Sequence, residues 1–274
     1  VLRDFGLSPI GEPFPHYLAQ GMVTKDGSAM SKSKGNIVDP DDILKKYGAD
    51  ALRVFIIFAS PPDKEFAWAE EGLEGCFRFL MRIWSLAHEN LDLFGAGEGA
   101  PVAAVAGDSA GLVLKKTHQT IRKVGEDIEV RFHLNTAVSS IMELLNLVKK
   151  ERDALRETAA GRDALRRAIE TIVAMLSPFA PHMAEELWER TGHRGLLMLS
   201  AWPAYDADLA REETVAIVVQ VNGKLRDKFE AEPGLAEAEL RARALALPKI
   251  QAALGGRPAR KVICVKDKLV NIVG

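Results

Sequence analysis

Apolar side chains recur every three or four positions through the middle of the chain, which is the spacing of one face of an α-helix. Four such stripes occur between residues 73 and 176, and a shorter helical segment follows over 182–190. Because the connections are modest in length, we expect an antiparallel helix bundle. The stripe positions are Leu73, Phe77, Leu80, Trp84, Ala87 and Leu91; Leu114, Thr117, Ile121, Val124 and Ile128; Leu134, Val138, Ile141, Leu145 and Val148; and Leu165, Ile169, Ile172 and Leu176.

The period changes from helical to two at the C-terminal end, where alternate positions of 215–221 are apolar. Asn222-Gly223 follows, a dipeptide that favours the two-residue turn of a β-hairpin. The predicted module has the order β-β-α-β-β. Its elements are strands over 215–221 and 224–230, a helix over 236–247 that ends at Pro248, and a second hairpin of 261–265 and 269–273.

Glycine and proline mark the boundaries between these regions. The first 38 residues are rich in both and predict a strand over 20–24 with a turn at 25–27, the tail of a larger unit. Residues 95–107 predict a loop. We therefore divide the chain into segments 1–68, 69–194, 195–214 and 215–274, the third being a linker. The predicted fold class is mostly α with a small α+β domain at the C-terminal end.

Composition and charge narrow the class of protein. No apolar run reaches the roughly 18 residues of a membrane span, and no signal-peptide pattern is present. The two cysteines, Cys76 and Cys264, exclude a four-cysteine zinc site, and we expect no metal site and a cytoplasmic location. Residues 215–274 carry a net charge of +5, whereas the rest of the chain carries −7. This asymmetry favours a basic module that binds an anion.

The run Ala29-Met30-Ser31-Lys32-Ser33-Lys34-Gly35-Asn36 carries the clearest chemical signal. Two lysines supply mobile positive charges, while glycine and serine let the backbone approach a polyanion. Asp39-Pro40 follows and predicts the start of a helix, with Asp39 as its cap. A loop of this composition is suited to the phosphates of a nucleotide.

The run resembles the second signature of class I aminoacyl-tRNA synthetases, Lys-Met-Ser-Lys-Ser, with Ala29 in place of the first lysine. The resemblance implies that Met30, Ser31, Lys32 and Ser33 bind the phosphates of ATP. It makes Lys32 the main catalytic residue, and we expect Lys34 to compensate for Ala29. The two serines either donate to phosphate oxygens or cap the loop, and we expect Met30 to anchor the loop in an apolar pocket.

The continuation to residue 53, including Tyr47-Gly48-Ala49-Asp50-Ala51-Leu52-Arg53, is similar to bacterial leucyl-tRNA synthetases. So are 219–224 and 268–274. The resemblance implies the end of a Rossmann catalytic domain over 1–68, an anticodon-binding-type bundle over 69–194 and a tRNA-binding domain over 215–274. It also implies ATP as substrate and Mg²⁺, for which we identify no ligand here.

The other ATP signature of the family, His-x-Gly-His, does not occur in the sequence. By the resemblance the chain covers the last third of such an enzyme, as a cut fragment or a small subunit. We therefore expect it to be inactive alone and to need the missing N-terminal catalytic and editing part. The other expected partner is tRNA(Leu).

Basic residues of segment 215–274 are the candidates for tRNA contact, because lysine and arginine supply most of the affinity for phosphates. With a two-residue turn, Lys224, Arg226 and Lys228 share one strand face opposite Val221, Val219 and Ile217. Further candidates are Lys261, Lys266 and Lys268. The cationic stretch of Lys115, Lys116, Arg122 and Lys123 is interpreted as a solvated helix face.

Two alternatives remain. The first is another class I enzyme, for valine, isoleucine or methionine, although two cysteines cannot make the zinc tail common in isoleucyl enzymes. The second is a non-catalytic tRNA-binding adaptor that keeps the loop as a relic, which Ala29 favours.

Overall fold

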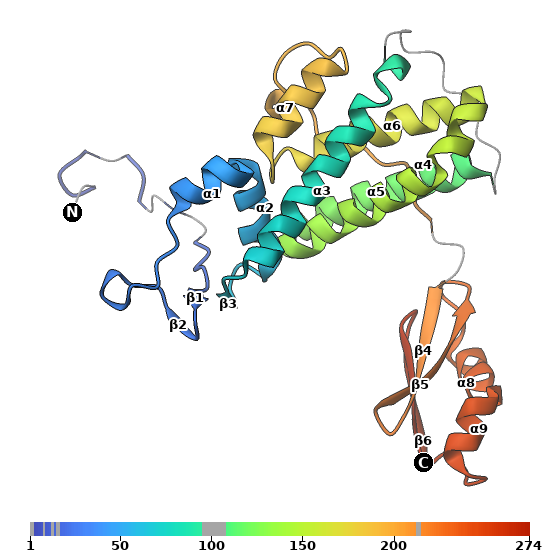
Figure 1. Cartoon of the computed structure of the whole chain (residues 1–274). Helices are drawn as coiled ribbons and strands as arrows, with labels where there is room; N and C mark the ends of the chain where they lie inside the picture. Colours follow the sequence, from blue (N-terminus) through green and yellow to red (C-terminus); the bar gives the residue numbers. More distant parts are fainter. Residues whose placement is uncertain (1–2, 8, 12–13, 15–16, 95–107, 212–214) are drawn as a thin grey trace. The chain divides into compact units, whose positions relative to one another are not determined.

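The computed structural model describes residues 3–7, 9–11, 14, 17–94, 108–211 and 215–274. Within it the chain separates into two compact units, Val1–Ala210 and Arg211–Gly274 (Figure 1). The first is mainly helical and the second combines a small sheet with two helices. The predicted loop over 95–107 lies outside the described residues.

The first unit begins with a small sheet and continues as a succession of helices. Its elements are β1 Val23–Lys25, β2 Ser28–Ala29, the 3₁₀ turn η1 Lys32–Lys34, α1 Pro40–Tyr47, α2 Ala49–Ala59, β3 Phe66–Ala67, α3 Glu70–His88, η2 Leu91–Leu93, α4 Ser109–Glu129, α5 Leu134–Glu157, α6 Ala159–Leu176, α7 Pro181–Arg190 and η3 Leu197–Leu199.

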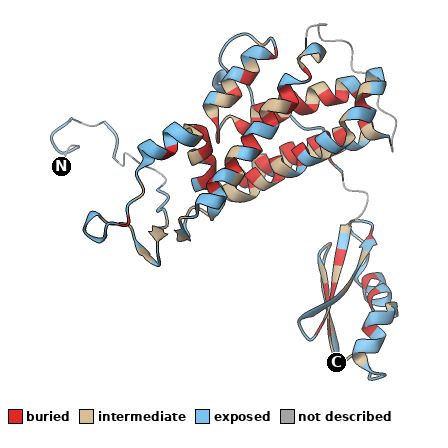
Figure 2. Ribbon diagram, in the orientation of Figure 1, coloured by how far each residue is buried: buried red, intermediate tan, exposed pale blue. Residues whose placement is uncertain are grey.

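The predicted helical stripes form the core of this unit. Figure 2 shows the buried positions along the inner faces of the helices and the exposed positions on their outer faces. Most stripe residues are buried, and Phe77, Trp84, Leu114, Ile128 and Leu134 are partly buried against the same core. Leu91 is predicted to continue the first helical stripe, but α3 ends at His88 and Leu91 begins η2. Helices α4, α5 and α6 pack closely on one another.

The turn between α5 and α6 is very tight because a single residue, Thr158, separates the two helices. Its side-chain oxygen accepts a hydrogen bond from the Gly161 amide at 2.9 Å and so caps α6. A Cβ atom at position 161 would lie 2.2 Å from the Leu155 carbonyl oxygen. Glycine at 161 therefore permits the close approach of α6 to the end of α5.

The small sheet at the N-terminal end has the strand order β2-β1-β3. Strands β1 and β2 form an antiparallel hairpin, and β1 pairs with β3 in parallel. The turn residues Asp26 and Gly27 both have positive φ, as the favoured two-residue hairpin turn requires. The predicted strand is therefore shifted along the chain, because β1 begins at Val23 rather than at residue 20.

Residues 195–210, assigned to a linker from the sequence, belong to the first unit. The Glu185 carboxylate accepts hydrogen bonds from the Leu197 and Met198 amides at 2.8 and 2.9 Å. Further along, the Asp206 amide donates to Nδ1 of His118 at 3.0 Å. These contacts attach the segment to α7 and α4. Residues 212–214 lie outside the described residues.

The second unit is a four-stranded sheet with two helices. Its elements are β4 Val215–Val221, β5 Lys224–Ala231, α8 Glu237–Ala246, α9 Pro248–Leu254, β6 Lys261–Val265 and β7 Leu269–Val273. The strand order is β5-β4-β7-β6, with β4 and β7 parallel at the centre. Pro248 ends the predicted helix but also begins α9, so the order is β-β-α-α-β-β rather than β-β-α-β-β. Proline suits a first helical position because its missing N–H needs no partner there.

The core of the second unit lies between one face of the sheet and the helices. It contains Ile217 and Val219 of β4, Leu240 of α8, Ile250 of α9 and Val270 of β7. The other face is more open, since Leu225, Ile263 and Val265 are exposed. Among the described residues of the whole chain, no helix has the length and apolar character needed to cross a bilayer.

The contact at His118 predicts a pH dependence of stability. Burial lowers the pKa of His118, and nearby Arg167 acts in the same direction against the opposing charge of Asp206. The folded chain then binds fewer protons than the unfolded chain near the ordinary histidine pKa of about 6.5. Stability from this site is present above that pH and lost as the pH falls. Urea unfolding followed by tryptophan fluorescence measures it, because all four tryptophans lie in the first unit.

A His118→Gln variant, which has no group titrating at this position, is the control. Between pH 7.5 and 5.5 the wild-type chain should lose more free energy of unfolding than the variant. Parallel pH profiles for the two proteins would show that His118 does not contribute.

Candidate functional site

The lysine-rich run predicted to bind phosphates forms a short loop that leaves the β1–β2 hairpin. Lys32–Lys34 make a single 3₁₀ turn, closed by hydrogen bonds from the Lys34 amide to the Ser31 carbonyl and from the Gly35 amide to the Lys32 carbonyl, both 3.2 Å. Gly35 ends the turn in the left-handed region, with φ of 66°, where glycine is favoured. The turn leaves both lysines exposed.

The base of the loop is held by the buried side chain of Asn36, which is 8% exposed. Its Oδ1 accepts a hydrogen bond from the Ser31 amide at 2.9 Å. Its Nδ2 lies 3.1 Å from Ser28 Oγ and 3.3 Å from the carbonyl oxygens of Lys25 and Ala29. One carboxamide therefore connects the loop to both strands of the hairpin.

Lys32 and Lys34 are exposed, and within the described residues neither ammonium group forms an ion pair. Both charges are therefore available to an anion outside the chain. Ser31 Oγ and Ser33 Oγ lie 3.2 Å apart and are hydrogen-bonded to each other. Ser31 occupies the N-cap position of the turn but makes no side-chain capping hydrogen bond. The exposed serine pair can exchange its mutual hydrogen bond for one to a phosphate oxygen.

The expected anchor, Met30, is half-buried, but it is not among the residues packed against the hydrophobic core in the described part of the chain. The loop is instead anchored by polar contacts at Asn36. The sequence did not reveal this role, although Asn36 is the last residue of the lysine-rich run that begins at Ala29.

The helix behind the loop begins as predicted. Asp39 caps α1 by accepting a hydrogen bond from the Asp41 amide at 2.9 Å, and Pro40 occupies the first helical position. A helix N-terminus often binds phosphate, but the first turn of α1 also contains Asp41 and Asp42. Their negative charges disfavour an anion there, which leaves the loop lysines as the cations of this region.

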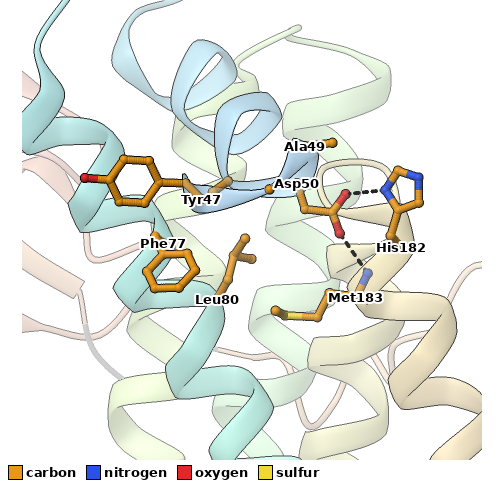
Figure 3. Close-up of a pocket in the computed structure, with 9 residues that line it drawn as sticks. Tyr47, Ala49, Asp50, Phe77, Leu80, His182 and Met183 are labelled. Atoms are coloured by element: carbon orange, nitrogen blue, oxygen red, sulfur yellow. Dashed lines mark hydrogen bonds and ion pairs between the residues drawn. The ribbon is translucent and has the colours of Figure 1, made fainter. Parts of the chain in front are cut away.

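A second junction joins α2 to α7. Asp50 Oδ1 lies 2.8 Å from His182 Nδ1, and Oδ2 accepts a hydrogen bond from the Met183 amide at 2.7 Å (Figure 3). Ala180, which precedes α7, provides no side-chain cap, so Asp50 caps that helix from another element. Both carboxylate oxygens are engaged, which is the pattern of a structural contact.

The same junction borders a largely apolar pocket of about 320 Å³. Figure 3 shows Tyr47, Phe77, Leu80 and Met183 around it, with Asp50 and His182 at one side. The polar contacts of Asp50 are directed at α7, and no cluster of charged groups faces the pocket. We assign it no chemistry.

The six candidate tRNA-binding residues of the second unit are all exposed, and they are Lys224, Arg226, Lys228, Lys261, Lys266 and Lys268. The predicted register of the first three is wrong beyond Lys224. Lys224 pairs with Val221 as expected, but a β-bulge leaves Arg226 as the extra residue, so Lys228 pairs with Val218 instead of Ile217. A bulge inserts one residue, which the alternation of side chains does not reveal.

The bulge separates these residues between the two faces of the sheet, because directly paired residues project to the same face. Val221 is buried under the helices, so its partner Lys224 lies on the helix side at the sheet edge. Lys228 lies on the open face with Val218. The Val218 amide also donates to the Lys268 carbonyl at 3.0 Å, so Lys268 borders β4 from the side of β7, across β4 from Lys228. Lys261 pairs with Val273 toward the other end of the sheet.

The cationic stretch of α4 is engaged within the bundle. Lys116 Nζ lies 2.8 Å from a Glu143 oxygen. Lys123 Nζ lies 2.6 Å from Ser140 Oγ and 3.5 Å from the buried carboxylate of Asp127. The sequence interpretation of a solvated face is therefore incomplete, because these two lysines connect α4 to α5 or to a buried charge.

Neither cysteine has the environment of a reactive thiol. Burial raises the pKa of Cys76 to about 11, and it also raises the pKa of Cys264. Both therefore remain protonated near neutral pH, whereas a nucleophile or metal ligand requires the thiolate. Within the described residues, no group of three or more His, Cys, Asp or Glu side chains is placed to bind a metal ion.

Two protein-family models match the chain. Residues 8–69, which include the loop, match the model of class I tRNA synthetases (I, L, M and V). Residues 111–241 match the model of the anticodon-binding domain of tRNA ligases. The second match extends beyond Ala210 into β4, β5 and α8 of the second unit.

Curated relatives match over the full chain. The leucine–tRNA ligase of Geobacter sp. strain M21 is 46% identical over 277 residues, which cover 100% of this chain and 33% of that protein. The leucine–tRNA ligase of Syntrophobacter fumaroxidans is 43% identical over 273 residues, with the same coverage. The chain thus spans about a third of the length of these relatives.

Solved structures give a consistent comparison. The ternary complex of Agrobacterium radiobacter K84 agnB2 LeuRS with tRNA and LeuAMS matches with a TM-score of 0.72 and 30% identity, over 99% of this chain and 34% of that one. Mycobacterium tuberculosis methionyl-tRNA synthetase with methionyl-adenylate matches with a TM-score of 0.53 and 20% identity, over 62% of this chain and 37% of that one, and supports the fold alone.

The signature loop and these matches point to the same class: the chain is similar to the class I aminoacyl-tRNA synthetases over residues 8–69 and to the anticodon-binding domain of tRNA ligases over 111–241. Within that class, the curated relatives described above are leucine–tRNA ligases, and the chain spans about a third of their length.

Proposed function

We propose that the chain is the C-terminal part of a leucine–tRNA ligase, an enzyme that activates leucine with ATP and transfers it to tRNA(Leu). The observation that carries this proposal is the full-length match to leucine–tRNA ligases, with the lysine loop exposed on a defined hairpin. In this proposal the chain supplies the loop that binds the ATP phosphates and the surfaces that bind tRNA. A cytoplasmic location follows from this function.

The proposed chemistry of the loop is electrostatic. In the first reaction the leucine carboxylate attacks the α-phosphate of ATP, and pyrophosphate leaves with increased negative charge. A cation already held near that charge lowers the barrier without reorganisation. Lys32, the first residue of the 3₁₀ turn, has no ion pair among the residues that the structure describes and fits this role, and Lys34 provides a second charge. The exposed Ala29 supplies none.

In this proposal each segment of the chain has its own function. Segment 1–68 continues a Rossmann catalytic domain, 69–194 is the anticodon-binding-type bundle, and the module from residue 215 binds tRNA. The leucine and adenine sites then belong to the N-terminal part of the enzyme, so the chain alone should not aminoacylate tRNA. Mg²⁺ is expected to accompany ATP, and the described residues of this chain provide no ligand cluster for it.

The open face of the sheet is the favoured tRNA contact. Lys228 of β5 shares this face with Val218, and Lys268 borders Val218 from the β7 side through its carbonyl; both lysines are exposed. The cations of α4 are weaker candidates because Lys116 and Lys123 already have partners within the bundle. Contacts of this kind position an RNA through its phosphates and do not read its sequence.

The alternatives from the sequence receive less support. The relatives at 43–46% identity are leucine–tRNA ligases, whereas the methionyl enzyme matches in fold at 20% identity. The adaptor hypothesis rested on Ala29, but the loop keeps Lys32 and Lys34 exposed and ordered on the hairpin.

The first test concerns the loop lysines. In the full-length enzyme, Lys32→Ala should slow leucine-dependent exchange between pyrophosphate and ATP by roughly 100-fold, or about 3 kcal/mol, because it removes a preorganised charge. Transfer of leucine from preformed adenylate to tRNA should change much less, because pyrophosphate has already left. Lys34→Ala should slow pyrophosphate exchange less than Lys32→Ala does. A larger loss for Lys34→Ala would reverse the two roles, and no loss for either would contradict the proposed function.

The second test concerns the open face of the sheet. Replacing Lys228 with Ala should weaken tRNA binding and reduce the salt dependence of the binding constant by roughly one unit of log–log slope, because one phosphate contact is lost. The double variant with Lys268→Ala should lose roughly two units. Binding titrations at several salt concentrations provide the measurement.

Lys249→Ala is the matched control, since it removes one positive charge from the same module. Lys249 Nζ lies 3.1 Å from the Asp227 carboxylate, on the helix side of the sheet. Equal losses for Lys228→Ala and Lys249→Ala would indicate a general charge effect. An unchanged slope for Lys228→Ala would place tRNA away from the open face.

A further inference from the structure

We propose that Asn36 is the positioning residue of the signature loop, and that it acts on catalysis through Lys32. This inference rests on the proposed function, because it concerns the same reaction. It goes beyond that function by assigning a role to a residue that carries no charge and is not exposed to the substrate. The hydrogen bonds of Asn36 and the scarcity of other anchors in the loop support this role.

The side chain of Asn36 is matched to its surroundings at both ends. Its one carbonyl oxygen faces an N–H donor, the Ser31 amide, at 2.9 Å. Its NH₂ group faces acceptors, with Ser28 Oγ at 3.1 Å and the Lys25 and Ala29 carbonyl oxygens at 3.3 Å. A carboxamide is the one common side-chain group that offers an acceptor and two donors from a planar head.

Close substitutes fail for specific reasons. Aspartate keeps an acceptor for the Ser31 amide but directs a negative oxygen at two carbonyl oxygens, and a buried unpaired charge is costly. Alanine leaves the Ser31 amide and the hairpin carbonyls without this partner. Glutamine is longer by one methylene group, so its head does not reach the same positions without moving the backbone.

These contacts define where the lysines stand. The hydrogen bond from the Ser31 amide to Asn36 Oδ1 closes a short segment that contains Lys32, Ser33, Lys34 and Gly35. The Nδ2 group of Asn36 then attaches this segment to the β1–β2 hairpin. Few apolar contacts hold the loop, because Ile37 is 44% exposed and Met30 is half-buried away from the main core. Val38, two residues beyond Asn36, does pack against that core and holds the chain where it leaves the loop. Removing the carboxamide therefore frees the base of the loop.

Loss of that fixation should affect catalysis more than folding. The bundle core does not include the loop, so stability depends mainly on other residues. A displacement of a catalytic group by about 1 Å, however, can cost roughly 100-fold in rate. We expect Asn36→Asp and Asn36→Ala in the full-length enzyme to lower kcat for pyrophosphate exchange by roughly 10–100-fold. The KM for leucine should stay unchanged, because the loop contacts phosphates.

Asn90→Ala is the control for general damage. Asn90 is also a buried asparagine with both ends engaged, since Nδ2 donates to the Leu86 carbonyl at 2.7 Å and Oδ1 accepts from Arg156 at 2.6 Å. It follows the far end of α3, which is about 28 Å long by the helical rise per residue. Asn90→Ala should lower the melting temperature with little change in kcat for exchange. Asn36→Ala should instead lower kcat for exchange with little change in the melting temperature.

A double-mutant cycle tests whether Asn36 acts through Lys32. If it does, adding Asn36→Ala to the Lys32→Ala variant should lower kcat for exchange little further, because the group that Asn36 positions is absent. The double variant should then be within about threefold of Lys32→Ala. Independent effects would instead multiply, and that result would overturn the proposal.

The outcomes separate this inference from the proposed function. If neither Lys32→Ala nor Lys34→Ala affects exchange, the proposed function itself fails. If Lys32→Ala is damaging while both Asn36 variants retain wild-type kcat, the function stands and the inference is wrong. A loss of kcat in Asn90→Ala equal to that in Asn36→Ala, at matched melting temperatures, also overturns the inference, because it would show a stability effect.

Discussion

One continuous hydrophobic core holds the helices of the first unit together. Among the described residues it extends from Ile43 of α1, just beyond the signature loop, to Leu197 near the end of the unit. Burial of apolar surface is the main favourable term in folding, so this core fixes α1 and α2 against the bundle. Asp50 adds a polar link by capping α7 from α2. The helices that follow the loop therefore belong to the same packed core as the bundle.

The loop itself lies outside that core and depends on hydrogen bonds. Its lysines must remain solvated and free of internal partners if they are to meet phosphates, so apolar burial is not available to order them. The Asn36 carboxamide and the φ of 66° at Gly35 supply the order instead. A few directional contacts at the base of the loop thus allow an exposed, charged tip to have a defined position. This arrangement suits electrostatic catalysis, in which the cation must already be in place.

Much of the fold followed from periodicity, because buried helix faces require apolar residues every three or four positions. The stripes through Leu80, Ile141 and Ile169 are core in the structure, and the change to period two predicted the hairpins correctly. The bulge at Arg226, the second helix after Pro248 and the parallel β4–β7 pair were missed, since each depends on long-range pairing or a single inserted residue. The loop was predicted from its residue types. The role of Asn36 was not, because its partners are backbone groups brought close by the hairpin.

The most direct test of this account is a crystal structure of the full-length enzyme with leucine and a non-hydrolysable ATP analogue. We expect Lys32 Nζ to lie within about 3 Å of a β- or γ-phosphate oxygen, the distance of a charge-assisted hydrogen bond. We also expect Asn36 to keep its bonds to Ser31 and to the β1–β2 hairpin. A structure in which the bound analogue is contacted by neither Lys32 nor Lys34 would contradict the central claim.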